Sequence, residues 1–103
     1  MNRGEVWDVD WPGVGRHPVV IVTRQVAIPL LTNVTVALVT STVRDLPTEV
    51  LLDERHGLER ESVVNCDSVL TVPKASMARR RGVLGVGELE ALAEALAIAL
   101  ELD

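Results

Sequence analysis

Residues that build covalent cross-links and metal centres are almost missing from this chain of 103 residues. Cys66 is the only cysteine, which excludes an internal disulfide and a zinc site with several cysteine ligands. The imidazole ligands are limited to His17 and His56. We therefore expect neither a dedicated metal site nor any other cofactor, and His56, within a polar stretch, is expected at the surface.

Long apolar runs are also missing. No stretch approaches the roughly 20 apolar residues that a membrane-spanning helix requires. The N-terminal residues MNRGEVWDVD are charged from the start and contain no apolar signal-peptide core. These features predict a cytoplasmic protein that does not enter a membrane.

Positive charge is in the minority, with Lys+Arg 10 against Asp+Glu 15, a net charge of -5 and a pI of about 4.9. Such a chain is not expected to coat nucleic acid nonspecifically, because that binding depends on many cations facing phosphates. The few cations are unevenly placed: residues 79–81 are all arginine, and Arg16 precedes an apolar run. A small, local basic pocket remains compatible with this pattern.

Aromatic residues are limited to two tryptophans, so the core must consist mainly of aliphatic side chains. Residues 4–11 alternate with a period of two, which predicts a half-buried strand. Residues 18–23 are continuously apolar and largely β-branched, which predicts a central strand. Pro18 stands at its first position, where a missing N–H is tolerated. Residues 24–32 show no clean period and are expected to form an irregular link. Further strands are predicted at 33–42, 48–53, 62–72 and 79–85.

The C-terminal segment 87–102, GELEALAEALAIALEL, has the composition and spacing of an amphipathic helix. Its leucine stripe is expected to pack on the sheet and comprises Leu89, Leu92, Leu96 and Leu100. A short helical turn is predicted at 73–77, where Pro73 suits the first position. Short strands followed by one helix predict a mainly β fold of the α+β class, a small barrel or tightly coiled sheet.

Several strings, in this order and spacing, resemble the MazF/PemK/Kid family of toxins. They are RGEVWDVD at 3–10, HPVVIVT at 17–23, VALVTST at 36–42, LPTEVLLD at 46–53 and GLERESVVNCDSVLTVPKASM at 57–77. The resemblance implies one toxin domain over residues 1–103, with an SH3-like β-barrel, a short helix and a C-terminal helix. It further implies a homodimer that cuts single-stranded RNA without a metal. The implied partner is a cognate MazE-like antitoxin, whose acidic tail crosses the dimer groove.

The resemblance also carries over candidate catalytic residues. The family's arginine before the proline of the second strand falls at His17, with Arg16 just ahead. Its threonine at the end of the third strand falls at Thr40. An acidic residue of the Kid-like branch matches Asp67, whereas that branch's arginine two residues earlier is replaced here by Asn65.

The chemistry of metal-free RNA cleavage assigns roles to these four catalytic candidates. A 2′-hydroxyl must lose a proton, a charged phosphorane must be stabilised, and the departing 5′-oxygen must gain a proton. Arg16 is expected to supply the cation, because a guanidinium matches phosphate oxygens and stays charged. His17 is the expected proton carrier. Asp67 is expected to accept a proton or orient its neighbours, and Thr40 to donate its hydroxyl to a phosphate oxygen.

Other residues are candidates for binding RNA around the cut. Trp11 is a candidate for stacking on a base, as aromatic side chains do in many complexes with single strands. The remaining candidates are Ser41, Asn65, Arg79, Arg80 and Arg81, of which the arginines suit either flanking phosphates or the antitoxin tail. Structural alternatives stay open: the arginines as solvated cations, Trp11 as a core residue and the catalytic candidate Asp67 as an aspartate that ends a turn.

Two other functions remain open at this level. The same barrel serves CcdB-like toxins, which bind DNA gyrase and have no nuclease activity, although the C-terminal ALELD offers no aromatic anchor for such an interface. A degenerate family member that binds its antitoxin without cutting RNA is the other alternative, since the usual arginines are absent at positions 17 and 65.

Overall fold

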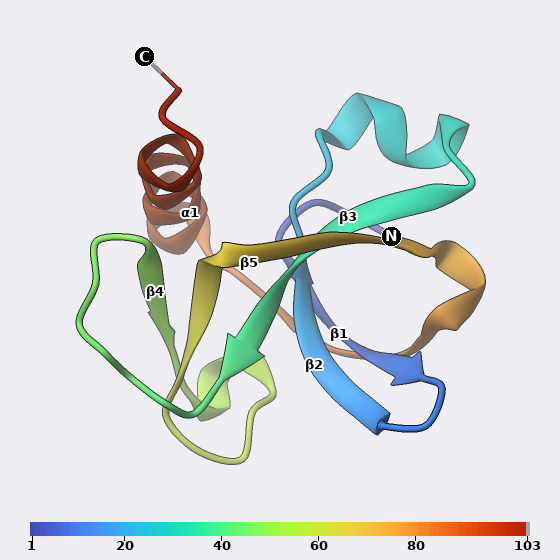
Figure 1. Ribbon diagram of the computed structural model, residues 1–103, viewed down its shortest axis with the longest axis horizontal. Helices are drawn as coiled ribbons and strands as arrows, with labels where there is room; N and C mark the ends of the chain where they lie inside the picture. The colour runs from blue at the N-terminus through green and yellow to red at the C-terminus, as the bar shows by residue number, and fades with distance from the viewer. Residues whose placement is uncertain (103) are drawn as a thin grey trace.

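The computed structural model describes residues 1–102. Within that range, six strands form one antiparallel sheet in the order β4-β5-β3-β2-β1-β6, which curls into a half-barrel (Figure 1). The strands are β1 (Glu5–Trp11), β2 (Gly15–Ile21), β3 (Asn33–Thr40), β4 (Glu49–Leu52), β5 (Ser62–Pro73) and β6 (Met77–Val83). Helix α1 (Val86–Ala99) packs against β4 and β5. The mainly β fold with a C-terminal helix is confirmed.

The central strands are buried on both faces. Val6 and Val20 belong to the core that α1 covers, whereas Val9 and Ile21 point to a second core on the opposite face. A strand between two cores needs apolar residues without alternation, which explains the continuous run in β2. The prediction of a half-buried β1 is therefore wrong: even Asp8 is buried there, because β1 lies between β2 and β6 with a core on each side.

The link at 24–32 is more regular than the sequence predicts. Gln25–Leu30 form a 3-10 helix, η1, which accommodates Pro29 within a short tight turn. Ala27 and Ile28 are buried, and Ile28 inserts into the second core. This insertion fixes a segment whose apolar residues follow no clean period.

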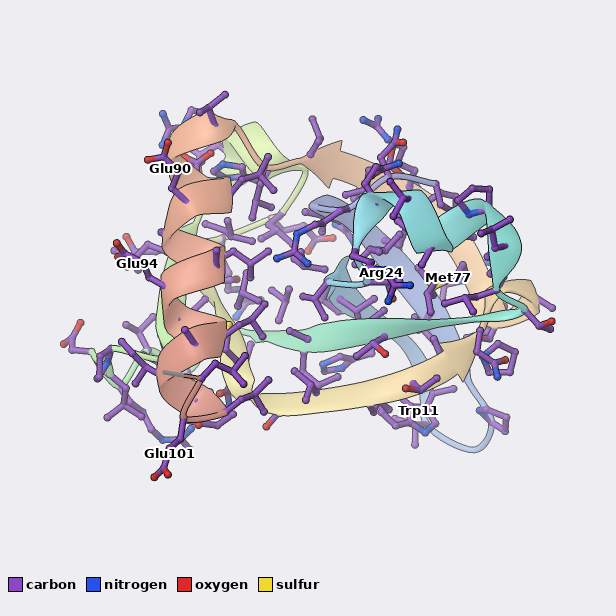
Figure 2. The ribbon with its side chains drawn as sticks, turned by 90° about the horizontal axis from the view of Figure 1, so that it is seen from above. Trp11, Arg24, Met77, Glu90, Glu94 and Glu101 are labelled. Carbon is purple, nitrogen blue, oxygen red and sulfur yellow. The ribbon has the colours of Figure 1, made fainter. Side chains whose placement is uncertain are left out.

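Helix α1 confirms most of the predicted leucine stripe. Three of its four leucines pack on the first core: Leu89, Leu92 and Leu96. Leu100 follows the end of the helix instead and is 52% exposed. Figure 2 shows Glu90 and Glu94 on the side of α1 that faces away from the sheet. None of the helices in residues 1–102 is long and apolar enough to cross a membrane.

Two further 3-10 turns are η2 (Glu54–His56) and η3 (Lys74–Ser76), and η3 confirms the helical turn expected at 73–77. His56 at the end of η2 is buried, at 4% exposure, so its expected surface position is wrong. Its Nδ1 accepts the backbone N–H of Asp53 at 3.1 Å, and its Nε2 lies 3.4 Å from Glu88 Oε1. The imidazole thus joins the loop of residues 53–61 to the start of α1.

Candidate functional site

A pocket of about 320 Å³ lies where β2, β3, β6 and the loop of residues 53–61 meet. Four of the predicted site residues line it: His17, Thr40, Ser41 and Arg81. They are far apart in the sequence. Pairing of β2 with β3, and of β1 with both β2 and β6, brings them to one end of the sheet. Their side chains do not share a face: His17 pairs with Val9, which points to the second core, whereas Arg81 contacts Asp8 on the other face of β1.

His17 of β2 lies at the rim of the pocket and pairs with Val9 of β1, so its side chain shares the face of the second core. Its ring meets the edge of Trp11 at right angles, with 6.3 Å between the ring centroids. Edge-to-face contacts of this kind are favoured between aromatic rings and limit their rotation. The imidazole is therefore half-buried and oriented beside Trp11, at the rim of the pocket.

Thr40 is the last residue of β3, and its hydroxyl is anchored locally. Its Oγ1 accepts the backbone N–H of Thr42 at 3.1 Å. Because a hydroxyl can both accept and donate, the O–H of Thr40 remains a donor for a group in the pocket. Ser41, the next residue, is exposed at the same rim.

Arg16 lies outside this pocket. Its Nε is 3.1 Å from Asp10 Oδ1, and the two side chains are 59% and 62% exposed. An ion pair between two such solvated side chains contributes little to stability. The guanidinium and the imidazole of the neighbouring His17 therefore do not share the pocket.

Asp67 and Asn65 also lie outside the pocket, at an irregularity of β5 opposite Ala37 and Leu38. Asp67 Oδ2 accepts the hydroxyl of Thr48 at 2.6 Å, and the Asp67 N–H donates to Asn65 Oδ1 at 3.0 Å. These bonds shape the bend of β5 and tie it to the chain that enters β4. Asn65 nevertheless pairs with Leu38 of β3, two residues before Thr40.

The three consecutive arginines have separate surroundings. Arg79 is exposed, Arg80 lies 3.1 Å from Glu5 Oε2, and Arg81 reaches the pocket. Burial alone would raise the pKa of Glu5, but hydrogen bonds from Trp7, the Asn2 N–H and Arg80 outweigh it and hold the pKa below its ordinary value. Arg80 therefore has a structural partner on the face of β1 opposite the pocket.

Trp11 lines a separate pocket of about 320 Å³ with apolar residues of β1 and β5. It lies away from α1, at the far side of the molecule (Figure 2). Its edge contact with His17 places it next to a residue that lines the first pocket.

Sequence reasoning missed three polar residues that line the pocket, Glu59, Arg60 and Ser62, as well as the apolar Pro18, Val39 and Leu58. The three polar residues belong to a stretch that reads as a polar loop and ends at β5. Gly57 marks a turn there, but nothing local indicates which strands the loop covers. The position of the loop is fixed by the buried His56 beside Gly57, which contacts the start of α1 and β6.

Cys66 is not a candidate nucleophile. It is 1% exposed, and burial, followed by the charge of Asp67, raises the pKa of its thiol to about 11. Among residues 1–102, no three histidine, cysteine or acidic side chains gather as a metal site.

Comparison with known proteins assigns the family. The family described as "PemK-like, MazF-like toxin of type II toxin-antitoxin system" matches residues 2–100 of this chain. Endoribonuclease MazF3 of Mycobacterium tuberculosis is 50% identical over 87 residues, which is 84% of each chain. The solved structure of the Mycobacterium tuberculosis toxin MazF-mt6 is 43% identical with a TM-score of 0.88, over 96% of this chain and 98% of that one.

A mycobacterial endoribonuclease solved in complex with its cognate antitoxin is also similar, with 28% identity and a TM-score of 0.89 over 100% of this chain and 97% of that one. Sequence and fold agree along nearly the whole length of the chain. The protein therefore belongs to the PemK-like, MazF-like toxins of type II toxin–antitoxin systems.

Proposed function

We propose that this protein is a toxin that cuts single-stranded RNA within sequence-specific sites, without a metal, through attack of a 2′-hydroxyl on the adjacent phosphorus. The products are a 2′,3′-cyclic phosphate and a 5′-hydroxyl. The observation that carries the proposal is the pocket at this end of the sheet, whose lining includes His17, Thr40, Arg60 and Arg81. Similarity to proteins named endoribonucleases supports it.

Each group in the pocket has a task in this reaction. His17 carries a proton between the reacting oxygens and solvent, because imidazole exchanges protons near neutral pH. Thr40 donates its hydroxyl to a phosphate oxygen. Trp11 and Ser41 lie beside the pocket, where we place the nucleotides that flank the cut, and the exposed Arg79 is a further contact for phosphates.

We also propose a single toxin domain in the cytoplasm, a homodimer and an acidic antitoxin as partner. An apolar groove of about 840 Å³ between α1 and the chain around η1 supports a protein partner. Leu31 and Leu100 line it and are 46% and 52% exposed, and Arg3 and Arg24 lie at the same groove. Apolar surface of this kind with cations beside it suits an acidic chain with apolar anchors.

Binding to gyrase without cleavage is not favoured, because relatives with 40% or more identity are named endoribonucleases. An RNA-cleavage assay distinguishes the two functions, because only the nuclease makes RNA fragments. The purified protein is expected to cut a long single-stranded transcript at a few sites in the presence of EDTA. The fragments should carry cyclic phosphate ends, measured by mass spectrometry.

Two controls complete this experiment. The cognate antitoxin should suppress the cuts, and a gyrase pull-down should recover no more gyrase than beads alone. Absence of cutting in EDTA, with cutting restored by Mg²⁺, would contradict the proposed metal-free reaction.

A further inference from the structure

The two tryptophans of the chain have different surroundings. Trp7 packs against the second core, and its Nε1–H donates to Glu5 Oε1 at 2.9 Å. Trp11 is a member of neither core, and its Nε1–H makes no hydrogen bond within residues 1–102 although it is open to solvent. A buried indole N–H usually has a partner, which identifies Trp7 as a structural residue. Trp11 instead presents a free donor at the surface.

Trp11 is one wall of the second pocket of about 320 Å³, which we call the Trp11 cavity. The rest of its apolar lining comes from β1, β5 and the turn after β1: Val9, Pro12, Leu70, Val72 and Pro73. Asp10 is the one charged residue of this lining, and Arg16 Nε lies 3.1 Å from its Oδ1. An aromatic ring in apolar surroundings, beside a carboxylate that is already paired, suits a flat and uncharged group of a ligand.

The Trp11 cavity lies on the face of the sheet that carries the second core. Val9 and Trp11 alternate along β1, so both side chains point to that face. His17 pairs with Val9, and Thr40 follows two residues after Leu38, which packs on the same core. The rings of His17 and Trp11 are in contact, with 6.3 Å between their centroids. His17 therefore lines the pocket that contains Thr40 and touches a wall of the Trp11 cavity.

We propose that the Trp11 cavity holds one base of the single-stranded RNA, an inference that deepens the function proposed above and rests on it. The base stacks on a face of the indole, as bases of single strands do on aromatic side chains. Its nucleotide then spans from Trp11 to His17, so the sugar–phosphate chain passes the pocket that contains Thr40. Because every base can stack, the cavity fixes the position of the strand and leaves the choice of sequence to other contacts.

An apolar side chain of the antitoxin is the competing occupant, and two observations favour a base. His17 meets the edge of the indole, so this contact leaves the faces of the ring available. The cavity also adjoins the residue to which we assign the proton transfer, whereas the groove of about 840 Å³ beside α1 offers an antitoxin a larger apolar surface. A base requires the aromatic ring, but an apolar side chain requires only apolar volume, and this difference can be measured.

The experiment uses an RNA oligonucleotide that spans a cut site mapped with the wild-type protein. The strand carries one 2′-deoxy residue on the 5′ side of the cut, so that it binds without being cut, and a dye at its 3′ end reports binding by anisotropy. We expect binding to quench the tryptophan emission of the wild type and of Trp7→Phe, because the stacked base contacts Trp11. The emission of Trp11→Phe should stay unchanged.

Two variants of Trp11 separate stacking from apolar volume. Trp11→Phe keeps an aromatic face, so its Kd for the strand should rise less than about threefold. Trp11→Leu keeps only apolar volume, so its Kd should rise about 5–150-fold, the usual effect of losing one stacked base. Thermal melting should show both proteins folded, since Trp11 is only half-buried at the end of β1. Trp7→Phe is the matched control, and its Kd should stay within about twofold.

Removal of single bases from the RNA identifies the nucleotide that occupies the cavity. Each nucleotide around the cut is replaced in turn by an abasic one. One position should weaken binding to the wild type about as much as Trp11→Leu does. The same replacement should weaken binding to Trp11→Leu no further, because both changes remove the same contact.

The outcomes are distinct. If the wild type does not cut the all-ribose strand, the proposed function fails and the base site falls with it. If the wild type cuts, the function stands, and the base site is refuted by unchanged wild-type emission, by a folded Trp11→Leu that binds as tightly as Trp11→Phe, or by abasic positions that all weaken both proteins equally. A Trp11→Leu protein that binds RNA normally and its antitoxin weakly would show an antitoxin side chain in the cavity.

Discussion

Replacing His17 with alanine is expected to slow RNA cleavage by about 10²–10⁴-fold, the usual contribution of a general acid or base. The fold should survive, because His17 is only half-buried near the start of β2 and its aromatic contact is the edge of Trp11. Single-turnover rates measured beside thermal melting separate the two effects. A variant that melts like the wild type and cuts slowly identifies a chemical role.

Exogenous imidazole provides the matched control. It should restore part of the rate to His17→Ala, because a small imidazole fits the space vacated beside Trp11 and exchanges protons in the same range. It should not restore Thr40→Ala, which lacks a hydroxyl donor. A His17→Ala variant that keeps the wild-type rate, or that imidazole leaves unchanged while Thr40→Ala responds, would contradict the assignment.

Replacing Gly57 with alanine is expected to cause the largest loss of stability, about 2–6 kcal/mol. Gly57 has φ +83°, a left-handed conformation that costs other residues about 1–3 kcal/mol. The added Cβ would also overlap the backbone of Arg81, and overpacking costs about 1–3 kcal/mol more. Because domains of this size are stable by about 5–15 kcal/mol, much of the protein should unfold in mild denaturant.

Urea unfolding measures this loss, and Gly87→Ala is the control. Gly87 lies within α1, and a Cβ there meets nothing within 4 Å. That exchange should leave stability unchanged or raise it by up to about 1 kcal/mol, because alanine favours helix. A Gly57→Ala protein that loses less than about 1 kcal/mol would show that the loop does not pack on β6 as described.

Most of the fold follows from local sequence patterns. Runs of β-branched residues predict β2, β3 and β5, and the leucine spacing predicts α1, because these patterns express which faces are buried. The order of the strands does not follow from them. The burial of β1 on both faces cannot be predicted from its alternating pattern, because it depends on which elements cover each face. Asp8 is expected in solvent until the fold places Arg81 beside it.

The candidate site was predictable only in part. His17 and Thr40 come together as expected of residues at the ends of neighbouring strands. Asp67 does not line the same pocket, and its carboxylate accepts the hydroxyl of Thr48 at the bend in β5, so its place in the site stays a prediction. Arg81 enters through a shift of register and a loop contact, two features that depend on residues far away in the sequence and leave no local pattern.

One chemical substitution tests the central claim, that this pocket directs a 2′-hydroxyl onto the neighbouring phosphorus. An RNA oligonucleotide that the protein cuts in EDTA is compared with one that carries a single 2′-deoxy residue on the 5′ side of the cut. The proposed reaction predicts that cutting at that bond disappears while the modified strand still competes for binding. Cutting of the deoxy strand at an undiminished rate would show that another nucleophile attacks the phosphorus.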